Sequence, residues 1–487
     1  MRLSNLTASN EGLTLQGNDT EITGITADSR NVSPGFLFIA IPGSQQDGRT
    51  YIDEAIKHGA AAILAPAGTP PDPAVPFLIS TDVRKALASI AAIFYPRQPE
   101  TIAAVTGTSG KTSTVQFIRE IWEQLGHRSA SIGTLGLVTA EESRYGSLTT
   151  PDAITLHRLL DECARNKITH LAMEASSHGL ELHRADRVRI KAAGFTNLSR
   201  DHLDYHQTME NYLAAKLRLF TEVAETGGTA VLNADIPEFS NLAEGAKAHG
   251  LKVLSYGQNG RDLKLIQATP NMQGQKLRLI VMGKAKDILL PVMGSFQAWN
   301  SLCALGIAIG CGENPDKATE ALGKVTGVPG RLQMAGTTKS GGAVFVDYAH
   351  KPDALENVLK AMRPHVARHR DAKLGVIFGC GGNRDKGKRP LMGEIAQRLA
   401  DWVIVTDDNP RREEPTTIRQ EILAGLKPGS DAQEIGDRLE AIRQGIGRLH
   451  EHDVLVIAGK GHESGQIVGD KVLPFDDMEV ARKVLTQ

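Results

Sequence analysis

The chain has 487 residues, which at roughly 150 residues per domain predicts about three domains. Hydrophobic residues make up 41% and charged residues 23%, an ordinary globular usage that excludes a wholly disordered chain. The 55 Lys and Arg residues nearly balance the 56 Asp and Glu residues, so the net charge is −1. This balance, with only 5% aromatic residues, argues against a nucleic-acid binder or a polybasic membrane binder.

The four cysteines are scattered without a CxxC pair, and they suggest neither a zinc site nor a disulfide framework. The first residues lack the apolar core of a signal peptide, and no apolar run reaches 18 residues. We therefore expect a soluble, cytoplasmic protein with no nucleic-acid partner and no membrane partner.

Residues 1 to about 97 predict a small α/β domain. The helical pattern that closes it ends just before Pro96, with Pro99 close behind, and two prolines after a helix indicate a domain boundary. The expected elements, in chain order, are a strand at Phe36–Ile41, helical and strand-like stretches over Tyr51–Ala65, a strand at Phe77–Ser80 and a helix at Asp82–Tyr95.

The second segment, residues 98–331, opens with a strand at Ile102–Val105, the glycine-rich stretch Thr106–Thr112 and a helix. Apolar residues at i, i+3, i+4 and i+7 predict that helix, and Gly126 predicts its end. Short β-prone stretches over Leu263–Met293 predict antiparallel strands attached to a parallel sheet. Further buried strands are expected at His170–Glu174, Ala192–Asn197 and Ala230–Asn233, and a helix near Asn300–Ile309.

In the third segment, residues 332–487, short apolar runs are separated by helical patterns. This alternation predicts a Rossmann-like doubly wound sheet. The expected strands are Val344–Tyr348, Leu374–Phe378, Trp402–Val405 and Val454–Ala458. The predicted fold class is therefore α/β with three domains: a small α/β N-terminal domain, a central P-loop-type mononucleotide-binding sheet and a Rossmann-like C-terminal domain.

The sharpest local motif is Gly107-Thr-Ser-Gly-Lys-Thr112, between a predicted strand and a predicted helix. Glycines allow phosphate to approach the backbone, and N–H groups at a helix start receive its charge. Lys111 would reach the β- and γ-phosphates, and Thr112 would hold magnesium. A full P-loop would place glycine at Val105, so this loop is a shortened version. The ordinary alternative is a glycine-rich turn with a solvated lysine, but the strand–loop–helix context favours nucleotide binding.

Two further clusters, Met173–Gly179 and Asn197–His206, each follow a predicted strand. Glu174 ends the first strand, where α/β sheets place groups that face ligands. His202 lies in the second cluster, and Lys216 follows it by fourteen residues. Singly, a glutamate is usually solvated and a histidine usually structural. Together beside a phosphate loop they supply the groups that a magnesium–ATP site needs.

Four polar loops follow the predicted strands of the third segment. Because the carboxyl ends of parallel strands share one edge of a sheet, these loops predict a binding crevice, although each alone could be an ordinary connection. The loops are Asp347–His350, Gly379–Arg389, Asp407–Arg412 and Gly459–Glu463.

The motifs TGTSGKT, MEASSHGL, NLSRDHLDYH, VPGR, DYAHKPDAL and GCGGNRDKGKRP, in this order, resemble the Mur ligase family of cell-wall synthesis, in its tripeptide-forming branch. The resemblance covers essentially the whole chain. DDNPR resembles the signature of members that add meso-diaminopimelate rather than L-lysine. The resemblance implies a UDP-substrate domain at 1–97, an ATPase and ligase domain at 98–331 and an amino-acid-binding domain at 332–487.

The implied activity is ATP-dependent amide ligation that adds meso-2,6-diaminopimelate to UDP-MurNAc-L-Ala-D-Glu in peptidoglycan precursor synthesis. ATP would phosphorylate the D-glutamyl carboxylate to an acyl phosphate, which the amino group then attacks. The resemblance implies ATP and Mg2+ as cofactors, and we expect a monomer. The carboxylate and the γ-phosphate are both anions and must approach each other. Positive charge from Lys111, Arg331 and magnesium would stabilise them.

The resemblance also assigns residues. Thr112 and Glu174 would serve one magnesium and His202 a second, and Lys216 matches the family's carbamylated lysine, an anionic metal ligand. The catalytic set is then Lys111, Lys216, His202 and Arg331. The expected ATP contacts are Gly107, Thr108, Ser109, Gly110, Lys111, Thr112, Ser113, Asn300, Arg331 and Asp347.

Substrate contacts are implied in all three domains. The residues that resemble the family's uridine site are Ser29, Ser44, Gln45 and Gln46. Those that correspond to its contacts with the rest of the UDP-sugar peptide are Thr149, Thr150, Ser176 and Arg184. Those that would hold the amino acid are Arg384, Asp408, Asn409, Pro410, Arg411, Gly459 and Glu463. Ser109 stands where asparagine is more usual, and Leu148 and Leu182 stand where related enzymes can carry polar contacts.

Three alternatives stay open from the sequence. The same ligase could use L-lysine. Folylpolyglutamate synthetase shares the phosphate loop and the general mechanism, but it gives no reason for the N-terminal domain. A non-catalytic ATP-binding module would not require Glu174, His202 and Lys216 together.

Overall fold

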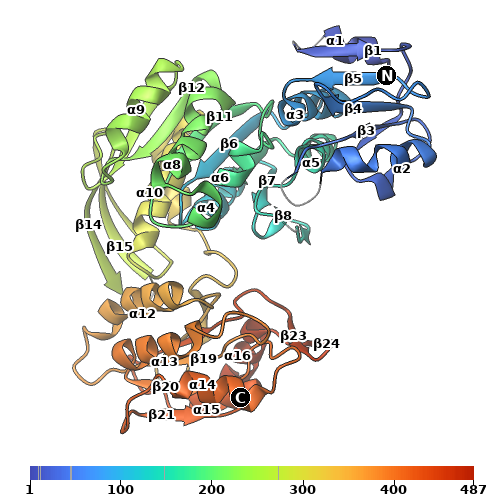
Figure 1. Cartoon of the computed structure of the whole chain (residues 1–487). Helices are drawn as coiled ribbons and strands as arrows, with labels where there is room; N and C mark the ends of the chain where they lie inside the picture. Colours follow the sequence, from blue (N-terminus) through green and yellow to red (C-terminus); the bar gives the residue numbers. More distant parts are fainter. Residues whose placement is uncertain (9, 11, 44–46, 147, 272–273, 487) are drawn as a thin grey trace. The chain divides into compact units, whose positions relative to one another are not determined.

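The computed structural model describes residues 1–8, 10, 12–43, 47–146, 148–271 and 274–486. The chain divides into two compact units, Met1–Asp262 with Cys303–Ala318 and Leu263–Leu302 with Thr319–Gln487. Parallel sheets flanked by helices confirm the α/β class (Figure 1). Within the described residues, no helix is both long enough and apolar enough to cross a membrane.

The first unit begins with a five-stranded sheet in the order β1-β5-β4-β3-β2. Successive side chains of its strands point to opposite faces, so it has two cores: Leu37 and Leu64 pack under α3, and Phe38 and Ile63 pack under α2. Asp82 caps α3 by accepting from the backbone N–H groups of the first turn. The bounds are α1 Leu3–Ala8, β1 Leu13–Gln16, β2 Gly24–Thr26, β3 Phe36–Ile39, α2 Ile52–Lys57, β4 Ala62–Pro66, β5 Phe77–Ser80 and α3 Val83–Phe94.

The central sheet of the first unit runs β13-β12-β11-β6-β10-β7-β8-β9. The strands from β13 to β7 are parallel, and β8 and β9 return antiparallel. The bounds of the strands are β6 Thr101–Thr106, β7 Ser129–Gly133, β8 Gly136–Thr139, β9 Ser143–Arg144, β10 His170–Glu174, β11 Ile190–Phe195, β12 Ala224–Asn233 and β13 Lys252–Gly257. The helices are α4 Lys111–Gln124, α5 Ala153–Arg165, α6 Ser177–Glu181, α7 Leu203–His206, α8 Met209–Arg218 and α9 Phe239–Ala248.

The expected strand at Ala192–Asn197 lies two residues too late. β11 begins at Ile190, where the pairing register shifts before Ala192, and it ends at Phe195. Asn197 therefore belongs to the loop after the strand. The expected strand at Ala230–Asn233 is the buried end of the longer β12, in which residues 225–227 are exposed.

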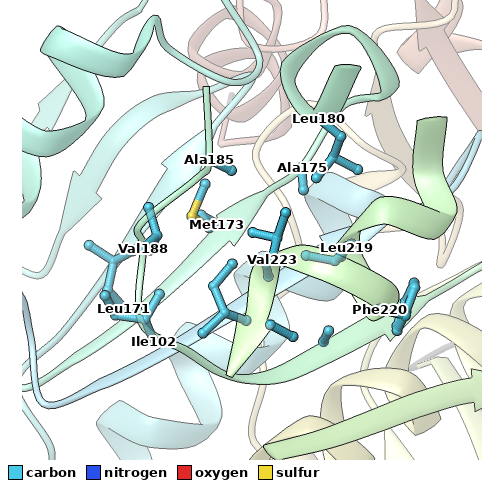
Figure 2. Close-up of a cluster of buried hydrophobic side chains, with 14 of the residues drawn as sticks. Ile102, Leu171, Met173, Ala175, Leu180, Ala185, Val188, Leu219, Phe220 and Val223 are labelled. Carbon is cyan, nitrogen blue, oxygen red and sulfur yellow. The ribbon is translucent and has the colours of Figure 1, made fainter. Parts of the chain in front are cut away.

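Figure 2 shows the hydrophobic core beneath this sheet. One cluster of fully buried side chains contains Ile102 on β6, Leu171 and Met173 on β10, and Leu219 and Phe220. This packing fixes β6 and β10, whose carboxyl ends carry the glycine-rich loop Gly107–Gly110 and Glu174.

In the second unit β14, β15 and β16 form the expected antiparallel strands. The sheet that follows runs β17-β18-β22-β19-β20-β21, and all its neighbours except β17 and β18 pair in parallel. The bounds of the strands are β14 Leu263–Asn271, β15 Gly274–Val281, β16 Lys284–Leu290, β17 Gln333–Thr337, β18 Ala343–Asp347, β19 Leu374–Phe378, β20 Trp402–Val405, β21 Ala432–Glu434, β22 Val454–Ala458, β23 Gly465–Val468 and β24 Lys471–Pro474.

Helices cover both faces of that sheet, which confirms the doubly wound prediction. α12, α13 and α14 pack on one face and α15 and α16 on the other. The bounds of these helices are α12 Pro352–Val366, α13 Lys388–Leu399, α14 Pro415–Leu423, α15 Arg438–Gly447 and α16 Asp477–Leu485. Two further helices, α10 Phe296–Gly310 and α11 Pro315–Leu322, each belong partly to the first unit and partly to the second.

A buried ion pair joins α15 to α16. Arg438 donates to Asp477 through Nε and Nη2, both at 2.7 Å, and both side chains are fully buried. Nη2 of Arg438 also donates to the carbonyl of Ala458 at 3.0 Å. Because Ala458 ends β22, the pair fixes the start of the loop that carries Gly459 and Glu463.

We predict that Arg438→Met lowers the free energy of unfolding by about 3–5 kcal/mol, because Asp477 is left as an unpaired buried charge. The double variant Arg438→Met/Asp477→Leu should recover most of that loss. Urea unfolding followed by tryptophan fluorescence measures both, and a double variant as unstable as the single one contradicts the explanation. Arg443→Met on the same helix is the control. Its pair with Glu440 lies on the helix surface, so its loss should leave the free energy of unfolding nearly unchanged.

Candidate active site

The glycine loop connects β6 to α4, as the sequence predicts. Gly107 has φ +140°, and a Cβ at this position would collide with the Thr196 hydroxyl. Gly110, with φ +85°, is the N-cap of α4 and has no side chain to cap the helix. The first N–H groups of α4 are therefore left for an anion such as phosphate.

The loop after β11 braces the glycine loop. The Ser109 N–H donates to Asn197 Oδ1 at 3.0 Å, and the Thr108 N–H donates to the Asn197 carbonyl at 2.9 Å. Thr196 Oγ1 donates to the Ser109 carbonyl at 2.7 Å. Sequence reasoning missed this bracing, because its partners lie almost 90 residues apart in the chain.

Two lysines lie against the same loop. Lys111 Nζ donates to the carbonyls of Gly107 and Thr108, both at 2.9 Å, and Lys216 Nζ donates to the Gly107 carbonyl at 2.8 Å. Lys216 is only 1% exposed, and its Nζ lies 4.3 Å from the centre of the Tyr212 ring. Burial, and then the charge of Lys111, hold the pKa of Lys216 well below its usual value. The structure thus brings both predicted lysines to the phosphate loop.

Glu174 ends β10 and is buried beside the start of α4. Its Oε1 accepts from Thr112 Oγ1 at 3.0 Å and from the Thr134 N–H at 2.8 Å. The Thr134 hydroxyl donates to Oε2 at 3.3 Å. Thr112 and Glu174 therefore lie together, as predicted. Thr134 was not identified from the sequence, because nothing in one sequence indicates which loop residue meets a strand end.

His202 lies at the N-cap of α7 with a positive φ of 53°, in a cluster of aromatic and imidazole rings. Its ring centre is 4.9 Å from that of His178 and 6.3 Å from that of Tyr212. Among the described residues, neither His202 nor Glu174 belongs to a compact group of three or more metal-ligating side chains.

Three of the four residues expected to contact the UDP-sugar peptide, Thr150, Ser176 and Arg184, are hydrogen-bonded to one another. Thr150 Oγ1 lies 3.0 Å from Ser176 Oγ and accepts from the Ser176 N–H at 2.9 Å. Arg184 Nη1 donates to the Thr150 carbonyl at 3.0 Å, and Thr149 Oγ1 lies 3.2 Å from the Thr134 hydroxyl. Thr150 is itself 1% exposed, so its hydroxyl holds this set in place.

In the N-terminal domain Ser29 is buried, and its hydroxyl donates to Glu54 Oε2 at 2.8 Å. His58 Nδ1 lies 3.0 Å from the Ser29 carbonyl. The expected contacts at Ser44, Gln45 and Gln46 lie outside the described residues. Glu54 and His58 are neighbours that the sequence did not indicate.

The predicted nucleoside contacts lie in the second unit. Asn300 is buried and donates to Gln297 Oε1 at 2.9 Å. Asp347, at the end of β18, accepts from the N–H groups of Leu332 and Ala349, and burial raises its pKa to about 6. The guanidinium of Arg331 lies 5.0 Å from the centre of the Tyr348 ring.

The four polar loops of the third segment surround a cavity of about 1000 Å³, the predicted crevice. Pro410 is not among the residues on its wall, although it was expected to contact the amino acid. Its carbonyl instead faces Gly382 so closely that any larger residue there would collide with it. The predicted residues that do line the cavity are Arg384, Asp408, Asn409, Arg411, Gly459 and Glu463.

The cavity carries both signs of charge. Asp408 is buried, and burial raises its pKa. Its Oδ1 has no hydrogen-bond partner among the described residues and lies 3.7 Å from Lys460 Nζ. Lys460 is also fully buried, 3.2 Å from both Glu463 Oε2 and Asn409 Oδ1. The sequence indicated no role for Lys460 within its motif. In the structure its buried ammonium group lies beside Asp408, Asn409 and Glu463, three residues predicted to bind the amino acid.

The two arginines of DDNPRR differ. Arg411 has φ +54°, lines the cavity and donates from Nη1 to the Gly382 carbonyl at 3.0 Å. Arg412 is largely exposed and pairs with Asp470 at 2.6 Å. The ordinary alternative to a binding role, a solvated loop arginine, therefore describes Arg412 but not Arg411. Arg389, fully buried between Glu413 and Glu421, also donates to the Gly381 carbonyl and so supports the same loop.

A glycine loop at a helix start, backed by two lysines and a buried carboxylate, defines a protein of the phosphate-loop class. Three family descriptions match successive parts of the chain: "Mur ligase family, catalytic domain" at residues 21–95, "Mur ligase middle domain" at 105–308 and "Mur ligase, glutamate ligase domain" at 330–461. The chain belongs to the Mur ligase family. Its three-domain α/β fold is the fold of that family.

Curated relatives match over nearly the whole length. Proteins of Bradyrhizobium diazoefficiens and Agrobacterium fabrum are 52% and 49% identical, over 96% of this chain and 95% and 94% of theirs. Both are named UDP-N-acetylmuramoyl-L-alanyl-D-glutamate–2,6-diaminopimelate ligase. A solved structure of a ligase with that name is 34% identical, with a TM-score of 0.74, and the match covers 96% of this chain and 95% of that one.

A folylpolyglutamate synthase of Mycobacterium tuberculosis has the same fold, with a TM-score of 0.59. It is 17% identical, and the match covers 77% of this chain and 92% of that one. This likeness extends to the fold alone.

Proposed function

We propose that this protein is an ATP-dependent amide ligase that adds meso-2,6-diaminopimelate to the D-glutamyl carboxylate of UDP-MurNAc-L-Ala-D-Glu in peptidoglycan precursor synthesis. The observation that carries the proposal is identity of about 50% over nearly the full length of relatives that bear this activity in their names. The phosphate loop and the charged cavity supply the two kinds of site that such a ligase requires.

The glycine loop would hold the ATP phosphates. The N–H groups at the start of α4 and the charge of Lys111 would stabilise the γ-phosphoryl group as it passes to the substrate carboxylate. Lys111 now donates to two carbonyls of its own loop, and a phosphate oxygen would replace them. From their match to the family's motifs, we also propose that Asn300, Arg331 and Asp347 contact ATP. The resulting acyl phosphate is open to attack by the amino group, which yields the amide, ADP and phosphate.

Magnesium fits the donor set beside the loop. Mg2+ binds hard oxygen ligands and takes one or two from the protein and the rest from phosphate and water. The Thr112 hydroxyl and the Glu174 carboxylate, 3.0 Å apart, are such oxygens, and His202 would serve a second ion. Bound magnesium would offset the repulsion between the carboxylate and the γ-phosphate.

Lys216 would carry a carbamate that serves as an anionic metal ligand. A lysine reacts with CO2 only as the neutral amine, and burial, which lowers the pKa of Lys216, favours that form. The ammonium form of Lys216 is disfavoured because burial removes its solvation. A carbamate on Lys216 would be stabilised by the positive charge of magnesium held by His202.

The cavity of the second unit would hold diaminopimelate. Arg411 and Arg384 offer guanidinium groups to the distal carboxylate, and Asp408 and Glu463 offer carboxylates to the ammonium groups. The Asp408 oxygen that lacks a partner among the described residues is a ready acceptor for an ammonium N–H. Asn409 and Gly459 would complete the wall.

The UDP-sugar peptide would bind the first unit, with uridine near Ser29 and the Ser44–Gln46 loop and the rest near Thr149, Thr150, Ser176 and Arg184. The domain boundaries 1–97, 98–331 and 332–487 then separate three ligand classes. We further propose that the enzyme is a cytoplasmic monomer. Its net charge of −1 and its 5% aromatic content argue against nucleic-acid and membrane partners.

The first test is ADP release by the purified protein. We expect release only when UDP-MurNAc-L-Ala-D-Glu and meso-diaminopimelate are both present. Lys111→Ala should lower kcat more than about 1000-fold, because phosphoryl transfer loses its cation, while the melting temperature stays near that of the wild type. ADP release that depends on a folate acceptor, or near-normal turnover by a folded Lys111→Ala protein, refutes the proposal.

Lys216→Ala should lower kcat at least about 100-fold, because an anionic ligand is lost from the phosphoryl-transfer site. Added acetate or formate should restore part of the activity by replacing that carboxylate. The matched control is Lys111→Ala, which lacks a cation and should gain nothing from either anion. Full activity of Lys216→Ala, or equal rescue of both variants, would exclude the carbamate.

Arg411→Ala tests the choice of amino acid. We expect kcat/KM for meso-diaminopimelate to fall by about 100-fold, which corresponds to the loss of roughly 2–3 kcal/mol of charge-assisted hydrogen bonding. The value for L-lysine, which lacks the distal carboxylate, should change by less than about tenfold. Arg412→Ala is the control, because Arg412 is exposed and paired with Asp470. A wild type that prefers L-lysine, or unchanged selectivity in Arg411→Ala, would favour the L-lysine alternative.

A further inference from the structure

Three metal-ligating side chains meet on the first unit, away from the glycine loop. His127 follows the end of α4, His170 is the first residue of β10, and Glu313 lies between α10 and α11. Glu313 Oε1 is 2.9 Å from His127 Nε2 and 3.8 Å from His170 Nε2. All three ligand atoms lie within 4.8 Å of one another, the one such group among the described residues.

Neighbouring side chains hold the two imidazoles in one orientation. Their rings stack with centres 3.9 Å apart and planes inclined by 28°, and both Nε2 atoms approach the same carboxylate oxygen. The other nitrogen of His170, Nδ1, lies 2.9 Å from Thr169 Oγ1. Trp122 packs edge-on against His170, with ring centres 5.0 Å apart. A hydrogen bond to the second nitrogen is how proteins orient a metal-binding histidine.

A simple ion pair explains only part of this arrangement. His127 and Glu313 alone could form one, but His170 Nε2, at 3.8 Å from the carboxylate oxygen, is beyond hydrogen-bond distance. A cation between the three atoms would use all of them.

The donor set indicates which metal. Two imidazole nitrogens and one carboxylate oxygen suit Zn2+, with water as a fourth ligand, whereas Mg2+ prefers oxygen ligands alone. His127 also lines a cavity of about 600 Å³, which has room for that water. The wall of that cavity also carries the carboxylates of Glu123, Glu141, Glu142 and Glu162 and the cations of Arg128 and Arg144.

The site lies at the opposite end of β10 from Glu174. His170 starts the strand and Glu174 ends it, a distance of about 13 Å along an extended strand. We propose that His127, His170 and Glu313 bind a divalent transition-metal ion of the Zn2+ type. The ion ties together the end of α4, the start of β10 and the connection between α10 and α11. This proposal is independent of the proposed ligase function.

The test uses the full chain, stripped with EDTA and titrated with ZnCl2 by calorimetry. We expect one Zn2+ to bind at this site, and Co2+ in its place to give the visible absorption of a four-coordinate ion. His170→Gln and Glu313→Gln should each weaken Zn2+ binding more than about 100-fold, since loss of an outer-shell partner alone costs 10–100-fold. Thr169→Val, which removes only the outer-shell partner, should weaken it by about tenfold.

His202→Gln is the control for zinc that binds at the other histidine cluster, and it should leave the titration unchanged. Zn2+ should also raise the melting temperature of the wild type but not of His127→Gln, a milder variant because His127 is partly exposed. Equal Zn2+ affinity in the wild type, His170→Gln and Glu313→Gln overturns the proposal. So does a wild type that binds no Zn2+, or binding that His202→Gln abolishes.

Discussion

The burial of the parallel strands decides where this protein can place polar chemistry. All six residues of β6 are buried, as are all five of β18, β19 and β22. A strand covered by helices on both faces excludes unpaired charge, so ionisable groups lie at its ends. The glycine loop follows β6, Glu174 ends β10 and Asp347 ends β18. The carboxyl edge of each sheet therefore carries the predicted ligands, as the topology of α/β sheets requires.

The loops at these edges are held by buried cations. Lys460 contacts Glu463 and Asn409, Arg389 lies between two glutamates, and Arg438 forms a two-pronged pair with Asp477. A buried cation needs partners on several sides, so each one fixes the loops that supply those partners. Lys216 differs, because the contacts that the described residues give it are a carbonyl and an aromatic ring. An amine in such surroundings is driven toward neutrality, which is the form that reacts with CO2.

Two elements of the first unit serve both of its proposed sites. α4 begins at the phosphate loop and ends just before His127, and β10 begins at His170 and ends at Glu174. Metal binding at the amino end of β10 would restrain the same strand and helix that position the phosphate ligands. The hydrophobic core between them, with Leu171 and Met173 fully buried, makes β10 a rigid connection.

The sequence by itself determined many of the buried strands and the local motifs. The strands at His170–Glu174, Leu374–Phe378, Trp402–Val405 and Val454–Ala458 agree residue for residue with the structure, because a buried strand is a local apolar run between polar ends. The glycine loop was equally visible, since the backbone angles at Gly107 and Gly110 are local requirements. Motif order was sufficient for the family, because each motif is a short contiguous stretch.

Only the tertiary structure decided which distant groups meet. It placed Lys216 on the carbonyl of Gly107, 109 residues away, and paired Arg438 with Asp477 in the core. It also assembled His127, His170 and Glu313 from three separate elements, although the cysteines had suggested no zinc site. The cavity wall includes Asn409 and Arg411 but not Pro410, which lies between them in the sequence. Residue spacing along a chain sets only local geometry, whereas these contacts depend on how strands and helices pack across the sheet.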